Sequence, residues 1–177
     1  METKFFLGGL GGQGVVVGGK MLGAAAAAKD MGATSYAEYA PAMRNGWTYC
    51  TTIVSDGIVD AAVTDVFDCM VFFDEDSCVK NSHKLNPGGV YIINRSLCHS
   101  EPAVKDAKVV EVMANDIADE MGNAKFLNVI MLGATIAATK VFDLEYMKDQ
   151  IREEFSAKPK IAEANIAALE RGASLVK

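Results

Sequence analysis

Glycines are concentrated in one short segment near the start of the chain, GLGGQG at residues 9–14. The segment fits the G-x-G-x-x-G pattern and lies between a first apolar run and a long stretch of helix-forming residues. Glycine lets backbone N–H groups approach a ligand, and a helix that begins there favours an anion. The pattern makes five residues candidates for cofactor binding: Gly9, Gly11, Gly12, Gln13 and Gly14.

The other parts of a nucleotide-binding motif are incomplete. Asp30 has about the right spacing for a ribose-binding acid but belongs to the helix end, whereas Glu38 ends the second strand but comes late. Lys20 follows Gly14 by six residues, which excludes a Walker lysine. Three interpretations therefore remain open: an NAD site, a site for another anion or nucleotide, and a turn that only packs a helix tightly on a sheet. In the last case, a side chain at Gly12 would strain the turn.

The cysteines and histidines have no metal-site spacing. The cysteines lie 19, 9 and 20 residues apart, without a C-x-x-C pair, and we expect them to be buried thiols: Cys50, Cys69, Cys78 and Cys98. His83 and His99 lack a partner for a metal site or a triad, so we expect surface or structural roles. The acidic segment FDEDS at residues 73–77 is most simply a solvated helix start. The sequence predicts neither a catalytic residue nor a metal ligand.

Composition excludes several classes of partner. The chain has 177 residues and a formal net charge of −6, and it contains no Lys/Arg cluster for a nucleic acid. Its longest apolar stretch, residues 126–138, is shorter than the roughly 20 residues that span a bilayer. The start Met-Glu-Thr-Lys lacks the pattern of a leader. We expect a cytoplasmic protein that binds neither nucleic acid nor membrane.

Strand-like and helix-like segments alternate along the first part of the chain, and helices fill the remainder. The predicted strands are residues 3–7, 33–39, 47–55, 66–73, 89–93 and 108–112. The predicted helices are residues 15–31, 74–85, 115–121, 125–140, 143–155 and 159–171, the last with Gly172 as its stop. The order predicts one α/β domain over residues 1–177: a Rossmann-like three-layer α/β/α sandwich on a mostly parallel sheet, with a helical C-terminal tail.

Several separated segments resemble one family, the gamma subunits of the 2-oxoacid:ferredoxin (acceptor) oxidoreductases. They are GLGGQGVV (9–16), SYAEYAPAMRNGWTYCTTIVSD (35–56), NVIMLGA (128–134) and EANIAALERG (163–172). The resemblance covers nearly the whole chain. The chain departs from the family pattern at Ala42 and at Asn45-Gly46, where a Glu and a Gly-Gly pair are common.

The resemblance implies a subunit that is inactive alone, in a complex that converts a 2-oxoacid and coenzyme A to acyl-CoA, CO2 and reduced ferredoxin. The 2-oxoacid would be 2-oxoglutarate, pyruvate or ketoisovalerate. It also implies that sister subunits hold thiamine diphosphate, Mg²⁺ and the iron–sulfur clusters, and that ferredoxin meets the chain through the complex. The alternatives are a stand-alone nucleotide-binding Rossmann-like enzyme and a regulatory module.

The segment from Tyr39 to Trp47, which ends the second predicted strand and begins the third, has the composition of a protein interface. Tyr, Trp, Met and Arg are the residue types that most often anchor such contacts. We therefore predict that Tyr39, Met43, Arg44 and Trp47 contact sister subunits. The alternative for Trp47 is that it is a core residue of its strand and does not contact a partner.

Overall fold

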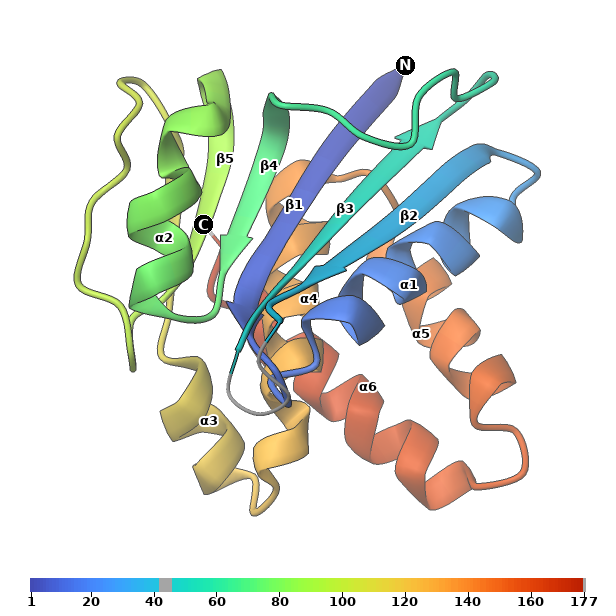
Figure 1. Cartoon of the computed structure of the whole chain (residues 1–177). Helices are drawn as coiled ribbons and strands as arrows, with labels where there is room; N and C mark the ends of the chain where they lie inside the picture. Colours follow the sequence, from blue (N-terminus) through green and yellow to red (C-terminus); the bar gives the residue numbers. More distant parts are fainter. Residues whose placement is uncertain (42–45, 177) are drawn as a thin grey trace.

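A six-stranded sheet in the order β2-β3-β1-β4-β5-β6 forms the centre of the molecule (Figure 1). The computed structural model describes residues 1–41 and 46–176. The strands are β1 (Glu2–Leu10), β2 (Gly32–Tyr39), β3 (Trp47–Ser55), β4 (Phe67–Phe72), β5 (Leu85–Asn94) and β6 (Lys108–Val112). The α-helices are α1 (Val15–Ala27), α2 (Glu75–Asn81), α3 (Ala114–Glu120), α4 (Leu127–Thr139), α5 (Leu144–Glu154) and α6 (Pro159–Ala173).

The strand pairing is mixed, with one strand running against the other five. β1 pairs parallel with β4, β4 with β5, and β5 with β6, whereas β3 is antiparallel to both β1 and β2. The connection from β2 to β3 is too short for the crossover that parallel neighbours need. The predicted α/β fold on a mostly parallel sheet is confirmed.

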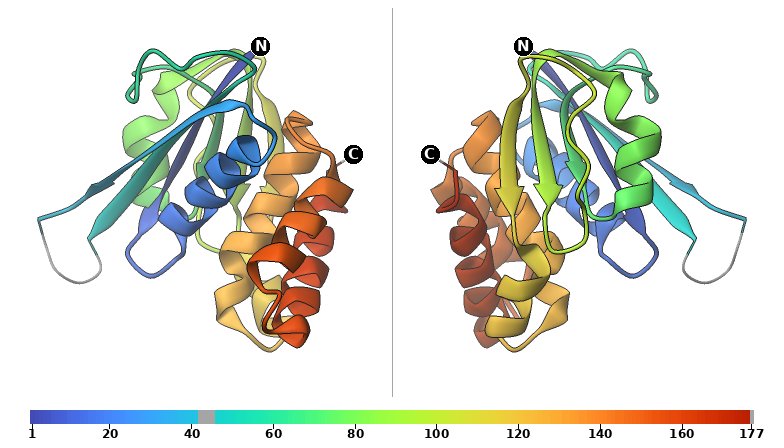
Figure 2. Two further views of the ribbon diagram at one scale, coloured as in Figure 1. Left: turned by 90° about the vertical axis from the view of Figure 1, so that its right-hand side faces the viewer. Right: turned by 90° about the vertical axis from the view of Figure 1, so that its left-hand side faces the viewer.

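Helices cover the two faces of the sheet unequally (Figure 2). Helices α1, α4, α5 and α6 lie on one face and enclose the larger hydrophobic core, while α2 lies on the opposite face over a smaller one. Phe6, Phe72 and Tyr91 pack in the smaller core with ring centroids 5.3–5.8 Å apart. In the described part of the chain, no helix has both the length and the apolar character needed to cross a membrane.

The four cysteines are free and buried, as predicted. Cys78 Sγ and the Tyr91 hydroxyl lie 2.6 Å apart in a hydrogen bond within the smaller core. Burial raises the pKa of the Cys98 thiol to about 12 and also raises that of Cys69. These thiols stay protonated at neutral pH and act as small apolar core groups.

Several element boundaries differ from the predictions. β1 extends through Gly9 and Leu10, because both pair with β3, so Gly9 is a strand residue. α1 ends at Ala27 instead of residue 31, and α2 ends at Asn81, before a 3-10 turn (Ser82–Lys84). A second 3-10 turn (Ala124–Phe126) precedes α4. β5 already begins at Leu85, and its pairing with β4 shifts register between Phe67 and Cys69.

The prediction that Gly172 stops the last helix is wrong, because α6 continues to Ala173. A Cβ at Gly172 would overlap the Ile130 carbonyl of α4, and one at Gly133 of α4 would overlap the Leu169 carbonyl of α6. The two glycines let the backbones of α4 and α6 touch. Gly172 is therefore a packing residue inside the helix.

We predict that Gly133→Ala lowers the free energy of unfolding by about 1–3 kcal/mol, because the methyl group forces α4 and α6 apart. Gly23→Ala in α1 is the matched control, since its Cβ would lie 3.8 Å from Ser35 Cβ, an ordinary contact. Replacing a glycine inside a helix without a clash should stabilise by about 0.5–1 kcal/mol. Urea unfolding of both variants checks this; equal stability of the two would contradict the packing role.

Candidate functional site

The glycine-rich turn links β1 to α1 over residues 11–14. The Gly11 N–H donates to the Gly46 carbonyl at 2.9 Å, which ties the turn to the segment before β3. Gly12 has φ +98° and Gly14 has φ +79°, a backbone region that other residues rarely adopt. Helix α1 begins without a side-chain cap and without an acidic residue in its first turn. The positive end of its dipole is therefore not neutralised by its own side chains.

Gln13 joins the ends of two neighbouring parallel strands. Its Oε1 accepts from the Leu10 N–H at 2.7 Å, and its Nε2 donates to the Phe73 carbonyl at 3.4 Å, just after β4. The chain leaves β1 toward α1 on one face and leaves β4 toward α2 on the other. Such a divergence is where doubly wound folds usually bind ligands. Here the Gln13 side chain lies between the two strand ends.

Gly9 makes room for the Gln13 side chain that bridges β1 and β4. A Cβ at this position would lie 2.6 Å from Gln13 Oε1 and 2.8 Å from Phe73 Cβ. The absence of a side chain therefore makes room for Gln13. Around Gly12, by contrast, nothing lies within 4 Å of such a Cβ, so what requires glycine there is the positive φ and not tight packing.

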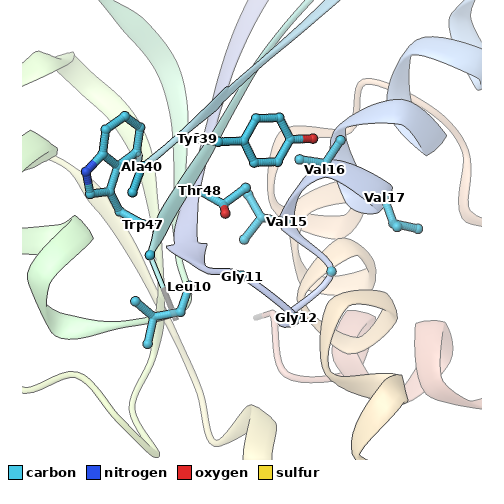
Figure 3. A pocket seen from close by; sticks show the side chains of 12 residues that line it. Leu10, Gly11, Gly12, Val15, Val16, Val17, Tyr39, Ala40, Trp47 and Thr48 are labelled. Atoms are coloured by element: carbon cyan, nitrogen blue, oxygen red, sulfur yellow. The ribbon is translucent and has the colours of Figure 1, made fainter. Parts of the chain in front are cut away.

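A pocket of about 400 Å³ lies beside the turn, where β1 ends, α1 begins, β2 ends and β3 begins (Figure 3). We call it the turn pocket. It is lined by Leu10, Gly11, Gly12, Gly14, Val15, Val16, Val17, Tyr39, Ala40, Gly46, Trp47 and Thr48. The pairing of Leu10 with Trp47 and of Gly9 with Thr48 brings the two segments together.

The turn pocket unites residues that the sequence placed in two separate groups. Gly11, Gly12 and Gly14 from the first group line it, as do Tyr39 and Trp47 from the second. Gly9 and Gln13 do not line it; Gly9 pairs with Thr48, and Gln13 bridges the ends of β1 and β4. Met43 and Arg44, also predicted for the interface, lie outside the described residues.

The aromatic residues of the turn pocket differ in exposure. Tyr39 is 63% exposed. Trp47 is half-buried and stacks on Tyr49 with ring centroids 4.6 Å apart. Thr48, which the sequence analysis missed, is only 7% exposed and contributes a hydroxyl group (Figure 3). The antiparallel register of β1 and β3 brings Thr48 to the turn pocket, and this register cannot be predicted from local sequence.

The acidic segment after β4 is a helix start, as expected, but its first carboxylate is not solvated, because Asp74 is only 6% exposed. The Asp74 side chain accepts from the Ser77 N–H at 3.0 Å and from the Ser77 hydroxyl at 2.6 Å. Glu75 accepts from the His99 N–H at 2.7 Å and from Ser100. The Ser100 hydroxyl holds the pKa of Glu75 below its usual range, with a smaller contribution from the His99 N–H. Both carboxylates are thus engaged in holding structure.

The histidines and acidic groups form no metal site in residues 1–41 and 46–176. His83 and His99 are exposed. No group of three or more His, Cys, Asp or Glu side chains in that part of the chain is placed to bind a metal ion.

Comparison with known proteins gives consistent matches over the whole chain. The family model described as pyruvate ferredoxin/flavodoxin oxidoreductase matches residues 4–175. Ketoisovalerate oxidoreductase subunit VorA of Methanothermobacter marburgensis is 30% identical over 173 residues, which are 97% of this chain but 36% of that protein. 2-Oxoglutarate synthase subunit KorC of Methanocaldococcus jannaschii is 28% identical and is covered over 95% of its length. The chain therefore spans about a third of the first relative and nearly all of the second.

Solved structures share the fold. Pyruvate oxidoreductase subunit PORC of Thermotoga maritima superposes with a TM-score of 0.82 at 26% identity, over 99% of this chain and 97% of that one. The keto/oxoacid ferredoxin oxidoreductase gamma subunit of Geobacter sulfurreducens gives 0.83 at 24% identity, over 99% and 96%. The 2-oxoglutarate:ferredoxin oxidoreductase of Magnetococcus marinus, with 2-oxoglutarate, coenzyme A and succinyl-CoA bound, gives 0.87 at 19% identity, over 98% and 31%.

We predict that Gly14→Ala destabilises the chain more than Gly12→Ala. Both substitutions strain a positive φ, at about 1–2 kcal/mol each. Only at Gly14 would the added Cβ lie 2.7 Å from the Asn128 side chain in α4. That overlap should lower the free energy of unfolding by a further 1–3 kcal/mol or so, measurable in urea. Equal losses for the two variants would show that backbone conformation alone constrains the turn.

Proposed function

Because the chain belongs to the pyruvate ferredoxin/flavodoxin oxidoreductase family, we propose that it is the gamma subunit of a multi-subunit 2-oxoacid:ferredoxin oxidoreductase. The complex would oxidise and decarboxylate a 2-oxoacid in the presence of coenzyme A, giving acyl-CoA and CO2 and passing the electrons to ferredoxin. The family match from residue 4 to residue 175 carries this proposal. It also supports treating residues 1–177 as one gamma-type domain.

The relatives support a role that depends on partner subunits. The same domain occurs as a chain of its own in KorC, which it covers to 95%, and as about a third of the longer VorA. In VorA, the remaining two thirds of the protein are joined to this domain in one polypeptide. A gamma chain that is separate must instead hold its partners by non-covalent contacts. We therefore infer that this chain binds sister subunits and reaches ferredoxin only through them.

We assign the cofactor chemistry to the sister subunits. The described residues contain no cluster of side chains placed to bind a metal ion. The four cysteines are free, and all are buried in the two hydrophobic cores. Residues 1–41 and 46–176 therefore offer no ligand set that fits Mg²⁺ or an iron–sulfur cluster. Free thiols are also typical of the reducing cytoplasm, where we place the complex.

The turn pocket is the part of this chain that we propose to take part in the reaction. Coenzyme A, which is bound in the Magnetococcus marinus enzyme, carries phosphate groups. Backbone N–H groups at Gly12 and Gly14, together with the start of α1, suit such an anion, and Gly11 lines the pocket while its own N–H is bound to the Gly46 carbonyl. Gly9 and Gln13 would support the ligand indirectly by holding the turn. Tyr39 and Trp47, with Met43 and Arg44, would contact the sister subunit.

We predict that the purified chain alone is colourless and does not turn over a 2-oxoacid. The complex purified with its sister subunits should absorb in the visible region and reduce ferredoxin in the presence of coenzyme A. Absorption spectra and ferredoxin reduction with 2-oxoglutarate, pyruvate and ketoisovalerate check this. Turnover by the chain alone would instead support a stand-alone enzyme, and failure to co-purify would support a regulatory module.

We predict that Tyr39→Ala weakens assembly by about 2 kcal/mol, the cost typical of an interface anchor, and leaves the lone chain's melting temperature nearly unchanged. Tyr36→Ala is the matched control, because Tyr36 is also exposed (45%) and lies on the opposite face of β2. Titration of the sister subunits with each variant measures the effect. If both substitutions weaken assembly equally, or if neither weakens it, Tyr39 is not an interface anchor.

A further inference from the structure

A second cavity of about 490 Å³ lies between the starts of α1, α4 and α6 and the end of α5. We call it the helix groove; it shares only Val17 with the turn pocket. Two of the segments that carry the family resemblance supply its walls: Asn128 begins NVIMLGA, and Ala164 and Asn165 belong to EANIAALERG. Nothing in the proposed reaction uses this cavity.

The wall of the helix groove is largely apolar. Met21, Phe126 and Phe155 are partly buried and pack against the larger core, while Val17 and Ile161 are 51% and 44% exposed. Pockets of about 300–1,000 Å³ with an apolar lining and a few polar groups are typical of small-molecule sites. The helix groove has this size and character.

Asn128 is the buried polar residue of the wall, whose other polar and charged residues are Asn123, Lys125, Glu154, Lys160 and Asn165. It is only 8% exposed and lines the groove, and within residues 1–41 and 46–176 its side-chain amide forms no hydrogen bond. Among the described residues, Thr34 Oγ1 is the fully buried side-chain N or O atom without a hydrogen-bond partner, so the Asn128 amide is open to solvent in the groove. The amide is therefore available to a bound molecule.

The electrostatics of the groove favour an anion. Helices α1 and α6 begin here without an acidic residue in the first turn or a side-chain cap, whereas α4 continues from the 3-10 turn Ala124–Phe126, in which the Asn123 side chain accepts from the Lys125 N–H. Lys160 lies in the first turn of α6, where the helix dipole disfavours a cation. Lys160 and Lys125 form no ion pair with another described residue, and Glu154 is the acidic group of the lining. A protein of net charge −6 thus places two lysines and the N-termini of α1 and α6 beside one largely apolar cavity.

We propose that the helix groove binds an amphiphilic carboxylate, a molecule with an apolar chain and one carboxylate group. The chain packs against Met21, Phe126 and Phe155, and the carboxylate accepts hydrogen bonds from the Asn128 amide and the lysines. A neutral apolar ligand would form no ion pair with the exposed lysines, and a cation would be repelled.

Sodium octanoate is the probe, titrated into the full-length chain by calorimetry, with 1-octanol and butyrate as the neutral and short-chain comparisons. Octanoate should bind once per chain and both comparisons at least about tenfold more weakly. The double variant Lys125→Gln/Lys160→Gln should weaken octanoate binding by about tenfold or more. Lys84→Gln/Lys105→Gln, which removes two other positive charges, should leave it unchanged.

A second variant, Ala164→Trp, fills the groove and should abolish binding; its melting curve shows whether the chain remains folded. Equal binding of octanoate and octanol, unaffected by the Lys125/Lys160 variant, would overturn the carboxylate assignment. The absence of octanoate binding would also overturn the carboxylate assignment. If in that case Ala164→Trp also prevents co-purification of the sister subunits, the groove is a protein-docking surface. Ferredoxin reduction by the wild-type complex tests the proposed function separately and does not depend on these results.

Discussion

The arrangement of the sheet around the glycine-rich turn depends on one side chain, Gln13, which holds the end of β1 to the end of β4. Gly9 makes room for it, and the Phe73 carbonyl receives its amide. The same carbonyl accepts from the Asn94 side chain at the end of β5, so one acceptor joins three consecutive parallel strands. With Gln13 in place, α1 starts directly over the sheet, and the first turn of the helix becomes a wall of the turn pocket.

This bridge explains why a dinucleotide-like glycine pattern occurs without a complete dinucleotide site. In G-x-G-x-x-G folds the crevice between diverging strands is open for a pyrophosphate. Here Gln13 lies in that crevice, and the space available to a ligand is displaced toward β2 and β3. The neighbouring residues there are Tyr39, Trp47 and Thr48. Gly9 and Gln13 of the motif support the packing of the fold, whereas Gly11, Gly12 and Gly14 line the turn pocket.

Most elements of the fold could be predicted from local sequence. The strands Trp47–Ser55 and Lys108–Val112 have the predicted bounds, because β-branched residues and flanking breakers mark them. The antiparallel direction of β3, the bridge made by Gln13 and the packing role of Gly172 could not be predicted, since each depends on contacts between distant segments. For the candidate site, the sequence indicated both halves of the turn pocket but not that they meet. The register that pairs Leu10 with Trp47 joins them.

In our proposal the turn pocket faces a sister subunit, and hydrogen–deuterium exchange of the lone chain and of the assembled complex tests this most directly. The account predicts slower exchange in the complex at backbone N–H groups of residues 11–17 and 46–48. The strands of the core should exchange at the same rates in both samples. Unchanged exchange across the turn pocket, with protection confined to other surfaces, would contradict the claim.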